Sequence, residues 1–478
     1  MKNEYEAVIG LEVHAQLATK TKLFCGDSTL FGAAPNTHIS PITLGYPGTL
    51  PKTNQQAIEF AIKMGLACNC EIELTNYFAR KNYFYPDLPK GYQISQHTTP
   101  ICKGGRVKIK TGDRERYVQL NRIHLEEDAG KSIHDIDENY TCIDLNRAGT
   151  PLIEIVTEPD LYSAEEAWQY VTEIRKLVRW LNICDGNMEE GSLRCDANVS
   201  VRLKGEKKLG TKVEVKNLNS IRNIKKAIEF EITRMIEELE AGNSIKQQTR
   251  SFNANNDTTF SIRDKEEAND YRYFPDPDLP AFVLSKDYIN NIAAKQPVLP
   301  AALIAQFQEV YALSLYDATQ LCEDKLTADY FEQVIGHTQS YKSVANWMLG
   351  PIKQYLNEEG IGFENMQLAP EQLAALIQLV DTDQVNFSVA AAKILPQLFK
   401  EKTHPLQIAE SLKLIQVSDT NELEKWIDAA LAAMPDKVSE YKKGKKGLIG
   451  LFVGEVKKAS KGTADPKLVT QLLQEKLK

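Results

Sequence analysis

The stretch Val8-Ile-Gly-Leu-Glu-Val-His14 decides how the first part of the chain folds. Leu11 and Val13 alternate with Glu12 and His14, a pattern typical of an extended strand with one apolar face and one polar face. In such a strand the Glu12 carboxylate and the His14 imidazole share a face. The stretch therefore predicts a β-strand that offers two metal ligands at once.

Three later segments offer further polar side chains in similar patterns. They are His124–Ser132 with Glu126 and Glu127, Arg194–Ser200 with Asp196 and Asn198, and Thr211–Lys216 with Glu214 beside Lys212 and Lys216. Oxygen ligands with at most one imidazole favour Mg²⁺ or Mn²⁺ over Zn²⁺, because zinc sites gather thiolates and several histidines. We therefore predict a Mg²⁺ and nucleotide site built from four segments. The alternative, that Glu12 and Glu214 are only the solvated faces of two strands, stays open.

The organisation of the chain changes near residues 296–300. At 478 residues the chain exceeds the roughly 250–300 residues that one hydrophobic core supports, so two or three domains are expected. Before this point, strand-like segments mixed with long helices after Ser163 and Ser220 predict an α+β domain with a mixed sheet. After it, short amphipathic helices continue to the C-terminus, with a second break near residues 403–420. The predicted domains are 1–294, 295–408 and 409–478, the last two all-α.

Composition narrows the classes of protein. No apolar run approaches the ~20 residues of a membrane span, and the first residues lack the order of a secretion signal, so we expect a cytoplasmic protein. The eight cysteines are expected to be reduced. The net charge of −8 argues against a protein that coats nucleic acid, although a basic cluster at Lys442–Lys446 allows local contact.

Two segments echo each other, Tyr83-Phe-Tyr-Pro-Asp-Leu-Pro89 and Tyr271-Arg-Tyr-Phe-Pro-Asp-Pro-Asp-Leu-Pro280. Their prolines hold the backbone extended, and their aromatic rings offer flat faces for a base or an amino acid. Packing of two loops is the other interpretation. Lys81 lies just before the first of these two segments, which favours the interpretation that this segment belongs to a functional site.

Common catalytic signatures are absent. Asp128-Ala-Gly-Lys-Ser132 is similar to the end of a phosphate-binding P-loop, but Leu125 stands where that loop needs glycine. Lys131 is still a candidate phosphate ligand. The chain also lacks a dinucleotide fingerprint, a nucleophile elbow and a complete pair of zinc-binding Cys-x-x-Cys motifs. A serine, cysteine or dinucleotide enzyme is therefore not expected.

Together these motifs resemble the B-subunit family of the bacterial tRNA-dependent amidotransferases, which act on glutamyl- and aspartyl-tRNA. The segments that carry the resemblance are Ile9–His14, Ala79–Gln96, Glu126–Lys131, Asp144–Arg147, Met188–Asn198, Asp270–Asp276 and Gly450–Gly462. The resemblance implies a cradle domain for ATP and the tRNA 3′ end, a helical domain, and a tail domain used against the tRNA body. It also implies a heterotrimer with an amidase-type A subunit and a small C subunit, in which ammonia from glutamine arrives through an internal channel.

The resemblance implies a carbon–nitrogen ligase. ATP would convert the side-chain carboxylate of Glu-tRNA(Gln) or Asp-tRNA(Asn) into an acyl phosphate, and ammonia would then displace phosphate. The implied Mg²⁺ ligands are Glu12, His14, Glu126, Glu127, Asp196 and Glu214. The implied catalytic residues are Glu127, as the acceptor of a proton from ammonia, with Glu126 and Lys81, and the implied contacts to the nucleotide or substrate are Lys131, Tyr83 and Arg147.

Two features limit this interpretation. Glu126 and Glu127 point to opposite faces of a regular strand, so both reach one cation only if a turn or bulge intervenes. Some members of the family also carry a four-cysteine zinc site, whose aligned positions here are Cys25, Asp27, Ser40 and Thr43. One thiolate does not hold a structural zinc, so we predict none.

Two functions of other classes stay open on the residues alone. One is a stand-alone Mg²⁺-dependent phosphotransferase, which would turn over ATP without tRNA. The other is a non-catalytic tRNA-binding scaffold, for which the basic tail and the aromatic segments would suffice.

Overall fold

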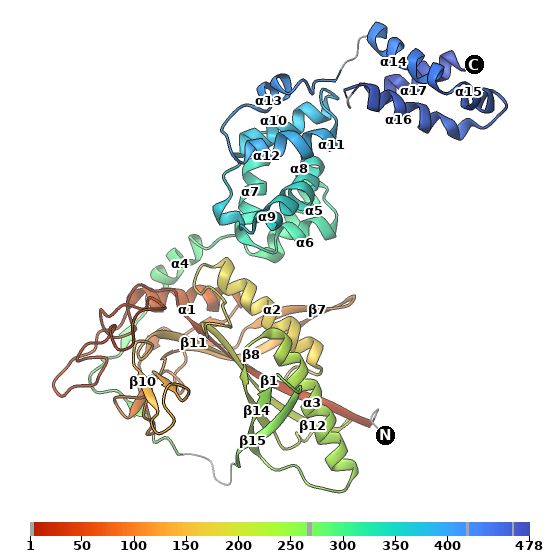
Figure 1. Ribbon diagram of the computed structural model, residues 1–478. Helices are drawn as coiled ribbons and strands as arrows, with labels where there is room; N and C mark the ends of the chain where they lie inside the picture. The colour runs from red at the N-terminus through yellow and green to blue at the C-terminus, as the bar shows by residue number, and fades with distance from the viewer. Residues whose placement is uncertain (1–3, 265–269, 417–419, 461–462) are drawn as a thin grey trace. The chain divides into compact units, whose positions relative to one another are not determined.

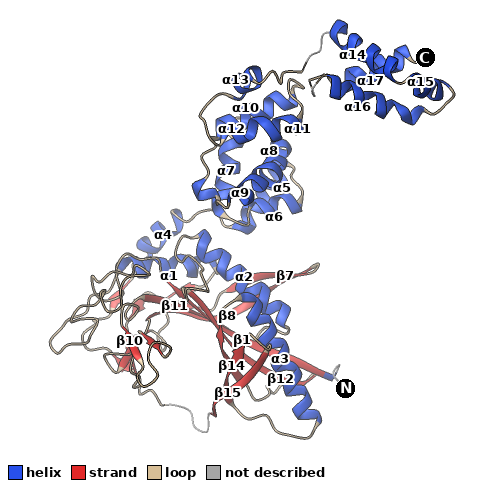
Figure 2. Ribbon diagram, viewed as in Figure 1, coloured by secondary structure: helices blue, strands red, loops and turns tan. Residues whose placement is uncertain are grey.

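The structure, a computed structural model, describes residues 4–264, 270–416, 420–460 and 463–478. The chain divides into two compact units, residues 1–299 and 300–478 (Figure 1). The boundary between the two units lies close to residues 296–300, where the sequence predicts a change from an α+β domain to short helices. A further division of the second unit near residue 408 stays a prediction. Figure 2 shows that strands occur in the first unit, whereas the described part of the second unit is helical.

The first unit is built on one large mixed sheet with the order β15-β14-β13-β12-β1-β11-β8-β5-β4-β16. The strands β13 and β14 run parallel, and the other neighbours in this order are antiparallel. The bounds are β1 Tyr5–Gln16, β4 Ala79–Asn82, β5 Tyr92–Ser95, β8 Arg114–Glu127, β11 Pro151–Thr157, β12 Leu193–Leu203, β13 Val213–Leu218, β14 Gln248–Asn253, β15 Thr258–Asp264 and β16 Phe274–Pro275.

Shorter strands complete the sheet at its margins. The strands β2 (Glu71–Ile72), β6 (Cys102–Lys103) and β7 (Arg106–Thr111) attach through β8, while β9 (Lys131–Ile133) pairs with β10 (Cys142–Asp144) and β3 (Thr75–Asn76) with β17 (Phe282–Val283). The chain thus leaves β8 at Glu127 and turns directly into the β9–β10 hairpin. That turn carries the Asp128–Lys131 motif to the edge of the central strands.

Helices cover one face of the sheet. They are α1 (Gln55–Ala67), α2 (Ala164–Trp180) and α3 (Ile221–Glu240), and Figure 1 shows α2 and α3 lying along the strands. Ser163 and Ser220 cap α2 and α3 by accepting hydrogen bonds from backbone N–H groups three residues later, as the sequence predicts. The apolar side chains Leu11 and Val13 of β1 are fully buried in the core between the sheet and these helices. The polar side of β1 therefore faces away from the helices.

The remaining helices follow the sheet. A short helix α4 (Lys286–Ala294) ends the first unit. The second unit contains α5 (Pro300–Tyr311), α6 (Leu315–Leu321), α7 (Lys325–Ile335), α8 (Tyr341–Trp347), α9 (Lys353–Glu359), α10 (Pro370–Asp381), α11 (Phe387–Val389), α12 (Leu395–Leu398), α13 (Pro405–Ser411), α14 (Thr420–Ala433), α15 (Pro435–Lys442), α16 (Ile449–Ala459) and α17 (Pro466–Lys476). The π-helical turns Met348–Ile352 and Ala390–Ile394 and the 3₁₀ turns Phe363–Asn365 and Lys446–Leu448 join some of them.

Two expectations from composition concern the cysteines and membrane-spanning helices. All eight cysteines are free thiols in the structure, three of them half-buried and five buried. Among the described residues, no helix combines the length and the apolar character that a membrane crossing needs. The residues of α14 to α17 form a small core of their own around Phe452 and Leu473.

Candidate functional site

The polar face of β1 is the centre of the candidate site. Glu12 lies opposite Asp196 of β12, and His14 lies opposite Glu154 of β11. Residues that pair directly across two strands project from the same face of a sheet. The register therefore gathers carboxylates from three neighbouring strands around the two side chains that the sequence singled out in β1.

The next strand, β8, extends this cluster. Its His124 pairs with Glu154, and Glu126 follows on the same face. The Glu126 carboxylate lies 3.5 Å from His14 Nδ1, and Glu154 Oε2 lies 3.1 Å from His124 Nε2. One ligand atom of each residue in the triad Glu12, His14 and Glu154 lies within 4.8 Å of the others, and the same holds for His124, Glu126 and Glu154. We call these five residues the acidic cluster.

Sequence reasoning missed His124 and Glu154, although the signal was present. Glu154 is the one charged residue in the apolar strand Pro151-Leu-Ile-Glu-Ile-Val-Thr157, and His124 alternates with Ile123 and Leu125. These are the patterns that identified Glu12 and His14. Two strands thus each contribute a histidine to this cluster, one of them, His14, among the predicted ligands.

The charges of the acidic cluster depend on one another. Burial acts to lower the pKa of His14, but the neighbouring carboxylates, above all Glu126, outweigh it and raise the pKa to about 9. Burial would raise the pKa of Glu126, yet hydrogen bonds from His124 and His14 hold it well below its usual range. Burial and the nearby Glu154 raise the pKa of Glu12. The two imidazoles and the carboxylates of Glu126 and Glu154 thus stabilise each other's charged forms, because the histidine pKa values are raised and the carboxylate pKa values are lowered.

The acidic cluster suits a divalent cation by its donor set. Carboxylate oxygens and imidazole nitrogens bind Mg²⁺, Mn²⁺ and related ions. Both ring nitrogens of the buried His124 lack a well-aligned hydrogen bond among the described residues, although Nε2 lies close to two carboxylates. Glu12 and His14 are partly exposed, whereas His124 and Glu126 are buried. A cation would therefore reach Glu12, His14 and Glu154 from solvent, with His124 orienting the carboxylates from below.

The other two predicted ligands, Asp196 and Glu214, are held by a lysine. Lys216 Nζ lies 2.6 Å from Asp196 and 3.0 Å from Glu214. Glu214 also accepts a hydrogen bond from Thr249, and Glu12 accepts one from Asn198. Burial opposes a charged lysine, but Asp196 and Glu214 raise the pKa of Lys216 well above its usual range. The structure thus divides the predicted ligand set, with Glu12, His14 and Glu126 in the acidic cluster and with Asp196 and Glu214 neutralised by an ammonium group.

Glu127 lies apart from the acidic cluster. The strand β8 runs through Glu126 and Glu127 in regular register with β11, so no bulge turns both side chains to one face. The Glu127 carboxylate accepts hydrogen bonds from Lys90 Nζ at 2.7 Å and from the backbone N–H of Ile94 at 2.9 Å. The structure therefore does not bring Glu127 to the other predicted ligands.

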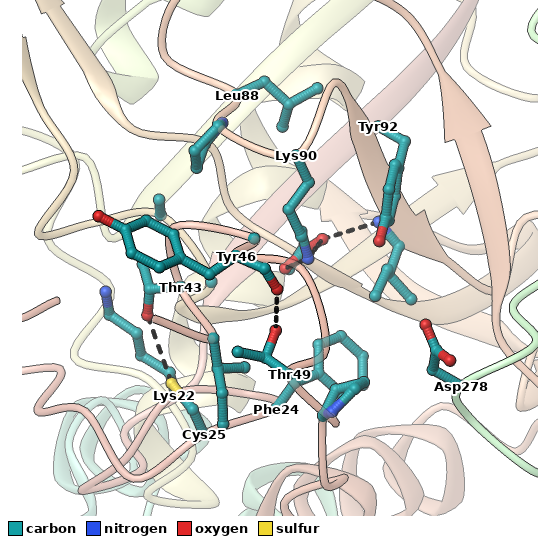
Figure 3. A pocket seen from close by; sticks show the side chains of 18 of the residues that line it. Lys22, Phe24, Cys25, Thr43, Tyr46, Thr49, Leu88, Lys90, Tyr92 and Asp278 are labelled. Carbon is teal, nitrogen blue, oxygen red and sulfur yellow. Dashed lines mark hydrogen bonds and ion pairs between the residues drawn. The ribbon is translucent and has the colours of Figure 1, made fainter. Parts of the chain in front are cut away.

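On its own side of the sheet, Glu127 lines a cavity of about 200 Å³. Figure 3 shows Lys90 and Tyr92 on one side of this cavity and Lys22, Thr43 and Tyr46 on the other. Lys22 is 1% exposed, and its Nζ donates to the carbonyl oxygen of His38 at 2.7 Å. Burial lowers the pKa of Lys22. The cavity is thus lined by two lysines and by the carboxylates of Glu127, Asp128 and Asp278.

The four positions that the resemblance aligns with a zinc site lie together next to this cavity, which Cys25 and Thr43 line. Thr43 hydrogen-bonds to Asp27, and its hydroxyl lies 3.4 Å from Cys25 Sγ (Figure 3). The Thr43 N–H lies 3.5 Å from the Ser40 hydroxyl. Burial acts against it, but hydrogen bonds from Thr43, Ser40 and Cys25 lower the pKa of Asp27. Hydrogen bonds therefore join the four side chains.

Asp128 organises the turn after β8, and sequence reasoning did not give it a role. Its carboxylate is 5% exposed and accepts hydrogen bonds from Gln16 at 2.7 Å and from Arg194 at 2.9 Å. Arg147 lies 3.8 Å away and donates to the carbonyl oxygens of Ala129 and Gly130. Burial opposes it, but the two arginines lower the pKa of Asp128. The carboxylate thus fixes both guanidinium groups.

Arg147 and Arg194 line a second, larger cavity of about 860 Å³. Lys131 and Asp196 line it as well, with Asn146, Asn217 and Asn219. Of the predicted contacts to nucleotide and metal, the structure therefore brings Lys131, Arg147 and Asp196 to one cavity beside the acidic cluster. Three cations, Lys131, Arg147 and Arg194, share this lining with several amides and with the carboxylates of Asp144, Asp185, Glu189, Glu190 and Asp196, so it suits a polar ligand whose anionic groups contact the two arginines and the lysine.

Lys81 and Tyr83 lie elsewhere on the same face as the acidic cluster. Lys81 Nζ is 4.9 Å from the ring centre of Tyr271 and 5.6 Å from that of Tyr83. Burial raises the pKa of Tyr83 well above its usual range. The two residues belong to an aromatic group rather than to the large cavity.

Comparison with known proteins agrees with this architecture. The sequence model of the GatB/GatE catalytic domain matches residues 7–290, and that of the GatB domain matches residues 329–477. The B subunit of the aspartyl/glutamyl-tRNA(Asn/Gln) amidotransferase from Geotalea daltonii is 49% identical over 99% of both chains. The proteins of the same name from Trichlorobacter lovleyi (49%, 99% of both chains) and Persephonella marina (47%, 99% of this chain and 100% of the relative) are similarly close.

These comparisons confirm the resemblance inferred from the motifs. They give no support to a stand-alone phosphotransferase or to a non-catalytic scaffold. Both halves of the chain match, and the relatives are covered over nearly their full length. The chain belongs to the GatB/GatE family, with a GatB/GatE catalytic domain over residues 7–290 and a GatB domain over residues 329–477.

Proposed function

We propose that this chain is the amide-forming subunit of a tRNA-dependent amidotransferase. Its substrate would be Glu-tRNA(Gln), Asp-tRNA(Asn) or both, as the names of its relatives indicate. The single observation that carries the proposal is the acidic cluster on the face of the sheet opposite α2 and α3, in a chain that matches those relatives from end to end.

The acidic cluster would hold Mg²⁺, with Glu12, His14, Glu126 and Glu154 as the ligands within reach. Mg²⁺ bound there supplies positive charge that neutralises a transferring phosphoryl group. His124 would fix the orientation of Glu126 and Glu154, since its Nε2 lies 3.6 and 3.1 Å from them. These side chains do no covalent chemistry, and their contribution is position and charge.

The cavity of about 860 Å³ would bind ATP. Arg147 and Arg194 are held in place by Asp128, so their free N–H groups are pre-oriented for phosphate oxygens. Lys131 lines the same cavity and would add a further positive charge. ATP would phosphorylate the substrate's side-chain carboxylate, and ammonia would then displace phosphate to give the amide.

Ammonia would come from an amidase-type A subunit, with a small C subunit completing the complex. This chain shows no serine-lysine or cysteine glutaminase signature, which supports an external source of nitrogen. Glu127 stays the proposed acceptor of a proton from ammonia. Glu127 would accept this proton from the cavity that it shares with Lys90, because its carboxylate faces away from the acidic cluster. The tail domain, at 409–478, would contact the tRNA body, and the helical domain at 295–408 precedes it.

The test is amide formation on Glu-tRNA(Gln) by the reconstituted complex, with ammonium chloride in place of glutamine. Glu154→Gln should lower the rate by at least 100-fold while the complex still assembles and binds tRNA. Glu115→Gln is the matched control, because Glu115 lies at the other end of β8, paired with Lys108. Full amidation by Glu154→Gln would overturn the assignment of the acidic cluster.

A further inference from the structure

Lys216 lies on the polar face of the sheet, next to the acidic cluster. It alternates with Glu214 in β13, so both side chains project from the same face. Glu214 lies opposite Asn198 of β12, and Asp196 lies two residues before Asn198 on that face. Asp196 in turn lies opposite Glu12 of β1. Three neighbouring strands therefore bring the carboxylates of Glu12, Asp196 and Glu214 to the part of the face where Lys216 lies.

The strand β13 is irregular just after Lys216. Its pairing with β12 shifts between Cys195 and Ala197. Two residues of β13, Lys216 and Asn217, therefore lie opposite the single residue Asp196, as in a β-bulge. Asn217 has a φ of 64°, in the left-handed region that asparagine adopts more readily than most residues. Asp196 and Asn217 both line the cavity proposed for ATP, so Lys216 lies at the wall of that cavity.

The ammonium group of Lys216 bridges two carboxylates. Its Nζ lies 2.6 Å from Asp196 Oδ2 and 3.0 Å from Glu214 Oε1. The side chains of Asp196 and Glu214 are 18% and 14% exposed, so water has little access to them. Thr249 donates a further hydrogen bond to Glu214 at 3.0 Å, which holds that carboxylate in place. The two carboxylates thus hold one cation between them, and this cation belongs to the chain itself.

The single positive charge of Lys216 is surrounded by more than one negative charge. Glu12, directly opposite Asp196, adds a third carboxylate and accepts a hydrogen bond from Asn198 at 2.9 Å. Burial raises the pKa of Glu12, and Asp196 and Glu214 are among the carboxylates that raise it further because they lie near it. Several carboxylate oxygens in one place are the donor set that Mg²⁺ and Mn²⁺ prefer. Without the ammonium group, this place would therefore suit a divalent ion.

We propose that Lys216 is a tethered cation that closes the space between Asp196 and Glu214 to divalent ions. This inference rests on the proposed function, which places Mg²⁺ at the neighbouring acidic cluster. Sites that transfer phosphoryl groups often use two metal ions about 3.5–4 Å apart. Here the ammonium group supplies the second positive charge at the wall of the cavity proposed for ATP. Because this charge is attached to the chain, it is present at every Mg²⁺ concentration, and only one ion has to bind from solution.

The experiment counts the Mn²⁺ ions that the full, chelator-treated chain binds without ATP or RNA, from the electron paramagnetic resonance signal of free Mn²⁺. Lys216→Met removes the charge and keeps most of the side-chain length, so this variant should bind one more ion per chain than the wild type. Lys216→Arg keeps the charge and should bind as many ions as the wild type. Lys212→Met is the matched control, because Lys212 is exposed just before β13, and it should also match the wild type.

A second substitution locates the additional ion. Glu214→Gln, added to Lys216→Met, should return the number of bound ions to that of the wild type, because a neutral amide still accepts the hydrogen bond from Thr249 but attracts a divalent ion weakly. The inference is overturned if Lys216→Met binds no additional ion, if Lys216→Arg gains one as well, or if the additional ion stays after Glu214→Gln. A wild type that binds no Mn²⁺, beside a Lys216→Met variant that binds one ion, would instead count against the proposed function and support the role of Lys216.

Discussion

Glu126 and Glu127 are neighbours in the chain, yet their carboxylates lie on opposite faces of the sheet. Glu126 lies among His14, His124 and the other members of the acidic cluster, whereas Glu127 is ion-paired with Lys90 beside a separate cavity. One peptide unit thus connects two chemically different environments. The two residues are expected to respond differently to the same substitution.

In the Glu126→Gln variant, Mg²⁺ should no longer raise the unfolding temperature. In the Glu127→Gln variant, Mg²⁺ should still raise it. The second change leaves the Lys90 ammonium without its carboxylate in a place where both side chains are buried, so it should lower the free energy of unfolding by roughly 3 kcal/mol. Thermal unfolding with and without Mg²⁺ measures both effects. An equal loss of the Mg²⁺ response in both variants would contradict the separation of the two faces.

A divalent cation should raise the unfolding temperature of the first unit. Like charges in the acidic cluster repel one another, and a cation that binds only the folded chain stabilises it by about 2.7 kcal/mol at a concentration one hundred times its Kd. Mn²⁺ should bind more tightly than Mg²⁺, because the His14 imidazole lies among the carboxylate ligands.

Calorimetric titration of the chelator-treated chain measures this affinity, and Glu154→Gln should lower it at least tenfold. Glu115→Gln should not change it, since Glu115 pairs with Lys108 on a distant part of β8. Unchanged affinity in Glu154→Gln would place the cation elsewhere.

Much of this arrangement could be predicted because strand periodicity is local. The alternation around Glu12 and His14 fixed the polar face of β1, and Ser163 and Ser220 marked the starts of two helices. The partners across strands could not be predicted, because register depends on contacts between distant segments. That is why Glu154 and His124, which share the alternating pattern, were not connected to His14.

The pairing of charged side chains across strands could not be predicted from the sequence either. The sequence places Glu214 beside Lys216, but only the folded sheet shows that the ammonium group lies between Glu214 and Asp196. Composition likewise gave no hint that Asp128 would fix two arginines at the edge of a cavity.

Lys216→Met should destabilise the chain in the absence of divalent cations. Asp196 and Glu214 would then face each other without the intervening ammonium group. Lys216 is partly exposed, so solvent screens the loss and we expect a cost of about 1–2 kcal/mol. Added Mg²⁺ should restore more stability to this variant than to the wild type.

Lys212→Met is the matched control for this prediction, because Lys212 is exposed on the segment just before β13. Denaturant unfolding with chelator and with Mg²⁺ measures the difference. Equal stability of the Lys216→Met variant and the wild type in chelator would show that the two carboxylates need no counter-charge.

The positions Cys25, Asp27, Ser40 and Thr43 should accept zinc once they are all cysteines. Thr43 already lies 3.4 Å from Cys25 Sγ and hydrogen-bonds to Asp27, and sulfurs around one zinc are about 3.8 Å apart. The triple variant Asp27→Cys, Ser40→Cys and Thr43→Cys should bind one zinc per chain, measured by competition with a chromophoric chelator.

Removing the native thiol tests whether the four positions act together. Adding Cys25→Ala to the triple variant leaves three thiolates, which should lower the zinc affinity by at least 100-fold, because a structural site needs four ligands. In buffer with excess Mg²⁺, the triple variant should also lose stability on addition of a zinc-selective chelator, whereas the wild type should not, since hydrogen bonds join these positions in the wild type. If the triple variant binds zinc no better than the wild type, the four positions are not arranged as a tetrahedral site.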